Sequence, residues 1–305
     1  MPYVTVIGAA NVDISAKSYA SIKPRDSNPG SILRSAGGVG RNIAENLARL
    51  SVDVKLIAAV GDDAHGEALL TQAKAAGIDV DYCYIDKEAA TSTYIAILDA
   101  NGEMHVGLMG DSAQLTMAHI QAQADLIAGS EIILVDSNLD RGINAKIMEQ
   151  FQGKALYVDP ISETKALRIR DFVGQFHTIK MNRQEAAVLA GFAITDDASL
   201  KKAGDYFLNR GTKRVIISLG EAGIYYKTQT EEIKQAAQPV TVKNATGAGD
   251  ALMAAVIYCS LEGKAAAYTA DFAQAMARLA LMSETTVSGR ISIEEVERQM
   301  KGWQE

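Results

Sequence analysis

The run YVTVIGAA at residues 3–10 is short, apolar and rich in β-branched residues, and it leads into a glycine. These features predict a buried first strand. Similar runs recur at residues 53–61, 131–136, 154–160, 177–182 and 213–220. Helical patterns lie between them, at residues 39–50, 66–77, 141–151, 183–191 and 199–211. This alternation predicts an α/β fold with a doubly wound, mostly parallel sheet and helices on both faces.

Two segments interrupt the alternation. Residues 12–35 are polar and irregular, and residues 91–109 have the pattern of two strands with a turn at Asn101–Gly102, a strong hairpin signal. A hairpin needs a surface to pack against, so we predict that both segments form one small β-rich lid. The alternative is two unrelated surface excursions. The predicted main domain is residues 1–11, 36–90 and 112–305, and the predicted lid is residues 12–35 and 91–111.

The composition narrows the class of partner. Thirty Lys and Arg residues against 37 Asp and Glu give a net charge of −7, which disfavours a broad nucleic-acid surface. No apolar stretch is long enough to span a bilayer, and the first residues lack a signal-peptide pattern. Neither the two cysteines nor the four histidines have metal-ligand spacing. We therefore expect a cytoplasmic protein with small-molecule partners, without nucleic acid or membrane.

The stretch NATGAGDA at residues 244–251 precedes a helical pattern that continues to about Gly263. Residues 247–249 then occupy the first helical turn, where backbone amides have no partner within the helix. Their small size lets an anion approach, and the helix dipole favours it. Asp250 would repel that anion, so we interpret it as a base for an attacking hydroxyl while the amides hold a phosphoryl group. The alternative is close helix packing with an acid that favours the helix N-terminus.

A second glycine segment, SAGGVGRNIAENLARL at residues 35–50, also precedes a helix. It matches neither the dinucleotide nor the Walker phosphate loop. Its Gly-Gly pair lets a polar ligand approach the main chain, and Arg41 and Asn42, the polar groups at the helix start, are predicted substrate contacts. Asn11 and Asp13 share one face of the chain after the first strand, where Asp13 can accept two sugar hydroxyls. The alternative for this pair is a turn.

Asn182 stands at the start of a predicted helix, with Glu185 three residues later. This is the spacing of a capping box, with Asn in place of Ser or Thr. The alternative is a magnesium role, because that ion is often held through water by few protein oxygens.

The two glycine segments, together with NRQE at residues 182–185, resemble the signatures of the ribokinase-like (PfkB) sugar kinase family. The resemblance covers essentially the whole chain, with Asn-x-Asp, SLGEAG and Gly-Ala-Gly-Asp in the expected order. It implies a ribokinase-like fold whose β-sheet lid closes over the substrate, and ATP-dependent phosphorylation of a sugar-type hydroxyl.

The resemblance also assigns residues by position. It implies that Asp250 is the base and that the amides of Gly247, Ala248 and Gly249 form the anion hole. Asn182 and Glu185 would organise Mg²⁺ and ATP. The residues implied to hold the sugar are Asn11, Asp13, Gly37, Gly38 and Asn42. The residues implied to lie along the nucleotide are Asn182, Ser218, Gly220 and Gly223.

Within the family, DSNPG at residues 26–30, followed by GGVGRNIAENLA, resembles the pseudouridine kinases more than the ribokinases. The first signature of ribokinases usually reads Gly-Gly-Lys-Gly-Ala-Asn, whereas this chain has Val39 and Arg41 at the Lys and Ala positions. The predicted base contacts are Asp26, Ser27 and Asn28, although DSNPG is also an excellent turn. The alternatives are a kinase for another nucleoside or for free ribose, and a non-catalytic nucleoside-binding relative.

One residue departs from the family pattern. Many relatives have Asp where this chain has Asn244, often near a monovalent-cation site. Asn keeps a carbonyl oxygen but loses the charge, which leaves potassium activation open. Lids of this kind also serve as dimer contacts, and the outer face of residues 91–109 is apolar, so we expect a homodimer through the lid.

Overall fold

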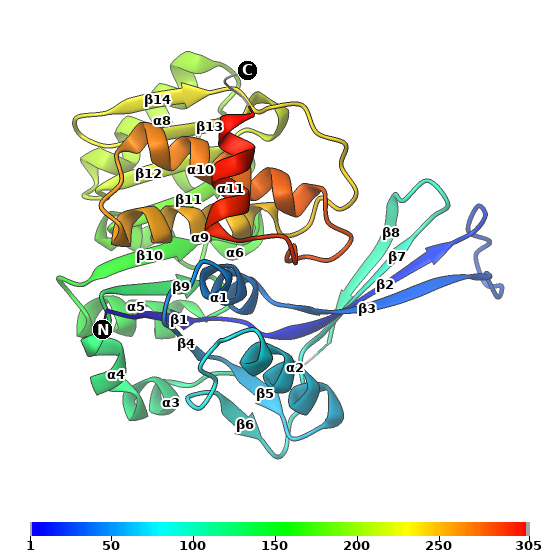
Figure 1. Cartoon of the computed structure of the whole chain (residues 1–305). Helices are drawn as coiled ribbons and strands as arrows, with labels where there is room; N and C mark the ends of the chain where they lie inside the picture. Colours follow the sequence, from blue (N-terminus) through cyan, green and yellow to red (C-terminus); the bar gives the residue numbers. More distant parts are fainter. Residues whose placement is uncertain (1, 111, 303–305) are drawn as a thin grey trace.

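The computed structural model describes residues 2–110 and 112–302. Figure 1 shows a layered α/β body from which a narrow sheet projects on one side. Residue 111, at the predicted lid boundary, and residues 303–305, at the end of the predicted main domain, lie outside the described residues. No helix within the described ranges is long and apolar enough to cross a membrane.

The body is built on an eight-stranded sheet with the order β14-β13-β12-β11-β10-β9-β1-β4. Its parallel strands are β4 (Val54–Ile57), β1 (Val4–Ile7), β9 (Ile132–Asp136), β10 (Ala155–Asp159), β11 (Thr178–Asn182) and β12 (Arg214–Ser218). The antiparallel strands are β13 (Ile224–Lys227) and β14 (Glu232–Gln235). The predicted doubly wound, mostly parallel sheet is confirmed.

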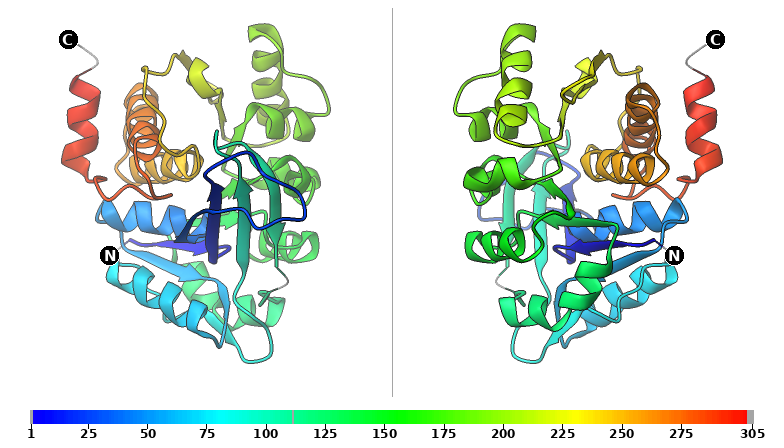
Figure 2. Two further views of the ribbon diagram at one scale, coloured as in Figure 1. Left: turned by 90° about the vertical axis from the view of Figure 1, so that its right-hand side faces the viewer. Right: turned by 90° about the vertical axis from the view of Figure 1, so that its left-hand side faces the viewer.

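Both faces of this sheet are covered, which explains why its strands read as continuous apolar runs. In β9, Ile132 and Leu134 point into one hydrophobic core, whereas Ile133 and Val135 point into the other. Figure 2 shows the two groups of helices on opposite sides of the sheet. The helices of the first core are α1 (Val39–Arg49), α2 (Ala64–Ala75), α9 (Ala248–Leu261), α10 (Ala266–Leu281) and α11 (Ile293–Lys301). Those of the second core are α3 (Met117–Ala122), α4 (Ala124–Gly129), α5 (Arg141–Gln150), α6 (Glu163–Ala166), α7 (Arg183–Ala190) and α8 (Asp197–Asn209).

The projecting sheet has the strand order β3-β2-β7-β8. Its strands are β2 (Asn11–Ser18), β3 (Gly30–Gly37), β7 (Thr93–Leu98) and β8 (Met104–Met109). Both predicted lid segments therefore contribute to one sheet, which we call the lid; the exact domain boundaries stay a prediction. Within the polar segment 12–35, predicted only as part of a β-rich lid, β2 and β3 form an antiparallel ladder from Asn11–Gly37 to Ser18–Gly30. Most of β3 is exposed, and neither strand has an apolar run that would locate it in the sequence.

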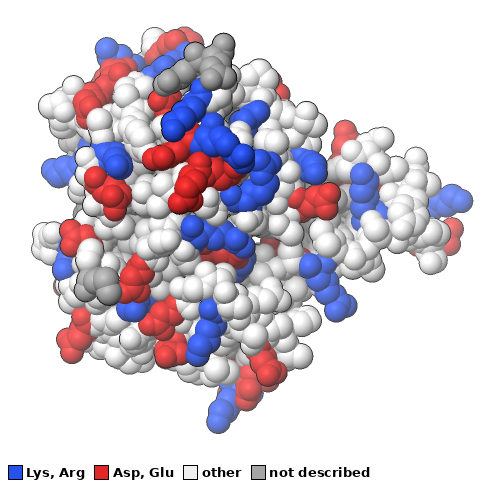
Figure 3. All heavy atoms as spheres, viewed as in Figure 1, with Lys and Arg blue, Asp and Glu red and all other residues white. Residues whose placement is uncertain are grey.

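The predicted single strand at residues 53–61 was also wrong. The chain forms β4, leaves the main sheet at Ala58, and continues as β5 (Ala59–Gly61), which pairs with β6 (Tyr84–Asp86) in a separate small sheet. Residues 56–61 are buried throughout, so the hydrophobic pattern continues across the break. On the face shown in Figure 3, basic and acidic side chains are interspersed over both the body and the lid.

Candidate active site

The predicted site residues gather where the parallel strands end. In open α/β sheets, ligands bind at the carboxyl ends of the strands, at the point where the strand order reverses. Here that point lies between β1 and β9, and the lid projects from the same edge (Figure 1). Asn11 follows β1, while Asn182 and Ser218 end β11 and β12 and are paired in register. The structure thus places residues from the first, middle and last thirds of the chain at this edge of the sheet.

The tip of α9 has open hydrogen-bond donors. Gly247 has φ +89°, and a Cβ there would collide with the carbonyl oxygen of Thr286, so the position requires glycine. Within residues 2–110 and 112–302, no protein acceptor receives the backbone N–H groups of residues 247–250. Gly247, Ala248 and Gly249 are half-buried and therefore not sealed from a ligand. The helix tip has the form that an anion site requires.

Asp250 lies in the first turn of α9 and faces α1. Asn42 Nδ2 donates to Asp250 Oδ2 at 2.8 Å, and Asp250 is only 8% exposed. Burial raises the pKa of Asp250 to about 7, with a further contribution from the charge of Asp159, while Lys180 and the Asn42 hydrogen bond oppose the rise. A carboxyl group with a pKa near neutral can take up and release a proton under physiological conditions.

Lys180 and Asp159 form a buried ion pair beside the helix tip, and the sequence reasoning missed both. Lys180 Nζ donates to Asp159 Oδ2 at 2.8 Å, and the two residues are 6% and 2% exposed. The ammonium lies against α9, because a Cβ on Gly249 would be 2.7 Å from Lys180 Nζ. Burial lowers the pKa of Lys180, but the charges of Asp159 and Glu185 outweigh it and raise the pKa above its usual value. The tip of α9 therefore lies beside a fixed positive charge.

Asn42 is held in one orientation by its neighbour. Arg41 Nη1 donates to Asn42 Oδ1 at 2.8 Å and to the Ala36 carbonyl oxygen at 3.2 Å, which leaves Asn42 Nδ2 to face Asp250. Arg41 also pairs with Glu45 within α1. Burial lowers the pKa of Arg41 to about 10, and the charge of Arg49 adds to this effect. Arg41, predicted as a substrate contact, positions Asn42 in the structure.

Asn11 and Asp13 lie on one face of β2, as predicted. Asn11 Nδ2 donates to Asp13 Oδ1 at 2.5 Å. A Cβ on Gly37 would collide with the Asp13 carboxylate, and Gly38 has φ +95°, so both glycines are required by close approach or by backbone conformation. Burial raises the pKa of Asp13, against the Asn11 hydrogen bond and the charge of Arg41. These residues form a polar surface at the base of the lid.

Asp136 joins this surface to the body, and it too was missed. Its Oδ2 accepts from Ala9 N at 2.8 Å and from Gly40 N at 3.0 Å, so one carboxylate fixes both the loop after β1 and the start of α1. Burial raises its pKa. Asp136 and Asp159 each follow an apolar run at a strand end, and that position is the signal that could have identified them.

The predicted capping box is present at the start of α7. Asn182 Oδ1 accepts from Glu185 N, and Glu185 Oε2 accepts from Asn182 N, both at 2.8 Å. Burial and the charge of Asp159 raise the pKa of Glu185. The charges of Asp159, Glu185 and Asp250 all raise the pKa of the Lys180 ammonium, and Asp159 bonds to it directly. No cluster of three metal-ligating groups exists in the described part of the chain, so water and phosphate oxygens would complete the shell of a magnesium ion, as that ion prefers.

The predicted nucleotide residues surround the turn after β12. Ser218 Oγ donates to the Met181 carbonyl oxygen at 3.3 Å, and Leu219 N donates to the Gly223 carbonyl oxygen at 2.8 Å. Gly220 and Gly223 both have positive φ, and the space where a Cβ on Gly220 would lie is open. The turn therefore exposes main chain beside the Asn182 end of β11.

Asp26, Ser27 and Asn28 lie apart from the other predicted substrate residues. They form an exposed turn at the far end of β2 and β3, and Asn28 bonds to Lys23 within that turn. Their proposed contact with a base stays a prediction that requires the lid to move. Asn244 Oδ1 accepts from Thr246 N at 2.9 Å in a local turn, and potassium activation stays open.

The chain is similar to known carbohydrate kinases over nearly its whole length. The model of the pfkB family of carbohydrate kinases matches residues 1–292. Pseudouridine kinase of Escherichia coli K12 is 38% identical over 297 residues, which cover 96% of this chain and 95% of that protein. A putative sugar kinase from Clostridium perfringens is 35% identical in sequence and has a TM-score of 0.88 over 99% of this chain and 96% of its own. Arabidopsis thaliana ribokinase, solved with ribose and ATP, shares the fold with a TM-score of 0.82 at 21% identity over 98% of this chain and 99% of its own.

Proposed function

This chain belongs to the pfkB family of carbohydrate kinases, and we propose that it transfers the γ-phosphoryl group of ATP to the 5′-hydroxyl of pseudouridine. One observation carries the kinase chemistry: the Asp250 carboxylate, oriented by Asn42, lies at an open helix tip beside the Lys180 ammonium. The tip offers unpaired N–H donors for a phosphoryl group, and the carboxylate lies in the first turn of the same helix.

The proposed reaction uses a general base and an anion hole. The 5′-oxygen attacks the γ-phosphorus, the bond from phosphorus to the bridging oxygen of ADP breaks, and the hydroxyl proton passes to Asp250. The amides of Gly247, Ala248 and Gly249, with Lys180, stabilise the charge on the phosphoryl oxygens in the transition state. Asn42 keeps the Asp250 carboxylate turned toward the acceptor. Glu185 and Asn182 would hold a magnesium ion through water, and the ion would neutralise phosphate charge.

The substrate assignment rests on relatedness. The E. coli pseudouridine kinase aligns over nearly the full length of both chains, and Asn11, Asp13, Gly37 and Gly38 provide a polar surface suited to ribose hydroxyls. The alternatives are a kinase for another nucleoside or for ribose, and a binding protein without turnover. We also place the reaction in the cytoplasm, where ATP is available and where the free thiols of Cys83 and Cys259 stay reduced.

A panel of acceptors tests the assignment. With Mg²⁺ and ATP, pseudouridine is expected to give a kcat/KM at least about tenfold above those of uridine and ribose, because its carbon–carbon glycosidic bond leaves an extra N–H for recognition. ADP release measures the rates, and ³¹P NMR identifies the 5′-phosphate. A higher kcat/KM for ribose or for another nucleoside would replace the assigned substrate, and binding without any turnover would support the binding-protein alternative.

We also propose that the lid forms a homodimer contact. Ile32, Ala16, Ile97 and Val106 are paired in register across all four strands, on the face opposite Asp13. Ile32 is 71% exposed, and Val106 is also exposed. A second copy of this chain offers a matching apolar row.

A charged side chain in this apolar row is expected to dissociate the proposed dimer. The native chain should sediment as a dimer at about 10 μM, and Ile32→Asp as a monomer, because pairing would bury an unpaired carboxylate at a cost of several kcal/mol. The control is Leu33→Asp, next along β3 on the opposite face of the lid, which should stay dimeric. A monomeric native chain, or dissociation by both variants alike, would contradict the proposed contact.

A further inference from the structure

A cavity of about 350 Å³ opens beside Asn11, at the point where the order of the body strands reverses. Its walls come from the loop after β1, the loop after β9, the chain between β8 and α3, and the region of α6. Ligand sites typically combine apolar walls with a few convergent polar groups and have volumes of about 300–1,000 Å³. Here Ala10, Ala59 and Leu139 provide apolar wall, and Asn138 and Lys165 provide the polar groups.

The lining also includes Asp140, Gln114 and Ser112, and at the Lys165 end it offers hydrogen-bond donors. Lys165 Nζ donates to Asn138 Oδ1 at 2.5 Å, which leaves two ammonium protons free, while the Asn138 side chain also bonds to the buried Asp136 carboxylate. Arg168 Nη1 donates to the carbonyl oxygens of Ser137 and Asn138, at 3.1 and 2.7 Å, and so fixes the loop that carries the amide. A ligand edge at this end must therefore present acceptors.

We propose that this cavity is the subsite for the base of a nucleoside acceptor, and that Lys165, held in place by Asn138, selects a uracil-type edge with its carbonyl oxygens. The inference rests on the proposed kinase function and deepens it. Asn11 lines the cavity and also belongs to the predicted ribose surface, whereas Asp250 lies among the residues that would receive the 5′-hydroxyl. Because the base and the 5′-carbon are attached on either side of the ring oxygen, a ribose between Asn11 and Asp250 directs its base toward the cavity.

The chemistry of the donors determines the selectivity. Uracil presents two carbonyl oxygens, and either can accept from the free protons of Lys165 Nζ. Cytosine has an exocyclic amino group in place of one of these oxygens, and adenine has no carbonyl oxygen; an amino group is a donor and cannot accept from a lysine. A site built to hydrogen-bond one edge rejects an analogue that leaves its buried polar groups unpaired. The cavity, rather than the exposed turn at residues 26–28, then carries the base.

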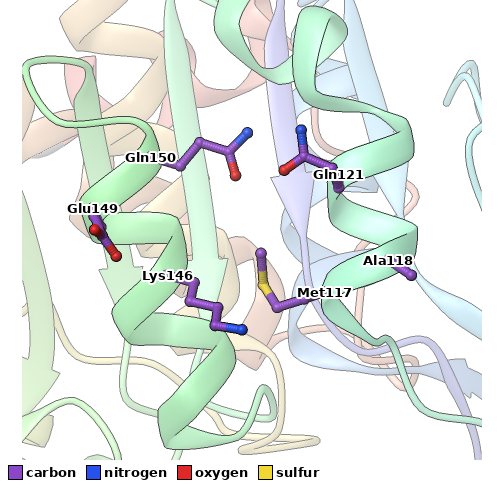
Figure 4. A pocket seen from close by; sticks show the side chains of 6 residues that line it. All are labelled: Met117, Ala118, Gln121, Lys146, Glu149 and Gln150. Carbon is purple, nitrogen blue, oxygen red and sulfur yellow. The ribbon is translucent and has the colours of Figure 1, made fainter.

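A second hollow, of about 580 Å³, provides a matched control. It lies between α3 and α5, and Figure 4 shows Lys146 on one side and Met117 on the other. These helices cover the body on the side away from the lid (Figure 1). Lys146→Met makes the same chemical change as Lys165→Met outside the proposed subsite.

Kinetics of Lys165→Met on pseudouridine, cytidine and ribose test the subsite. The variant is expected to lose about 10- to 100-fold in kcat/KM for pseudouridine, to lose most of its preference over cytidine, and to stay within about twofold for ribose. Lys146→Met should match the native protein on all three. An equal loss on ribose and pseudouridine, or no loss on either, would overturn the subsite. Asn138→Ala provides a second variant, with melting temperatures to identify any failure to fold.

These experiments test the base subsite separately from the proposed function. If the native chain phosphorylates none of the acceptors, the function is wrong, and calorimetric binding of pseudouridine then judges the subsite alone. Native binding that Lys165→Met weakens at least about tenfold supports the base subsite. Equal binding by both, or none by the native chain, overturns it.

Discussion

Asp250→Asn is expected to lower kcat for the nucleoside by about 10²- to 10⁴-fold, the range for loss of a positioned general base. Asparagine keeps the shape and an oxygen for the Asn42 hydrogen bond, so the dissociation constant of the nucleoside should change by less than about threefold. Steady-state kinetics and calorimetric binding measure the two effects. Asp62→Asn, at an exposed position, is the control and should match the native protein.

Asp250→Asn is also expected to change how the stability of the protein depends on pH. The pKa of Asp250 is raised to about 7 in the folded protein from an ordinary value of 3.8, so the folded state binds this proton more tightly than the unfolded state does. The stability that the proton provides is therefore present below about pH 4 and is lost as the pH rises to about 7. Asparagine does not titrate, so Asp250→Asn does not lose this stability as the pH rises. At pH 8 the variant should unfold at an equal or higher temperature than the native chain. A variant that keeps turnover, or that loses it only by unfolding, would contradict the assigned role.

Lys180→Met is expected to reduce both stability and turnover. Removing one partner of a buried ion pair leaves Asp159 without compensation and typically costs about 3–5 kcal/mol. Loss of the ammonium also removes positive charge from the tip of α9, so we expect kcat to fall by about 10²- to 10³-fold. Because Lys180 lowers the pKa of Asp250, the pH at which kcat/KM reaches half its plateau should move upward.

The double variant Lys180→Met/Asp159→Asn separates these effects. Asparagine removes the uncompensated charge, so urea unfolding should show much of the lost stability restored, while kcat stays low because the ammonium is still absent. Recovery of turnover together with stability would show that Lys180 is only structural. Retention of full kcat by the single variant would contradict its place in the anion hole.

The apolar runs were enough to predict the parallel strands of the body, because a strand buried on both faces is apolar at nearly every position. The lid strands β2 and β3 could not be found in that way, since Ser, Lys and Arg side chains on an exposed ladder resemble a loop. The break at Ala58 was hidden for the opposite reason, because buried residues continue across it.

The candidate site was predictable where a residue type is unusual for its position. Glycines and an acid at the start of an apolar helix identified Gly247 and Asp250. Lys180 was missed because it is one polar residue within an apolar strand, and its pairing with Asp159 depends on the lateral order of β10 and β11. Tertiary structure likewise determines the register that pairs Asn182 with Ser218. It also determines the cavity lined by Lys165.

The pH dependence of kcat/KM for the nucleoside, in the native chain and in Asp250→Asn, tests the central claim most directly, because this parameter reports groups in the free enzyme. The native profile should rise tenfold per pH unit below a pKa near 7 and level off above it, as Asp250 loses its proton. The Asp250→Asn profile should lie far lower and lack that titration. If both proteins show the same rise at comparable rates, the acid at the tip of α9 is not the base.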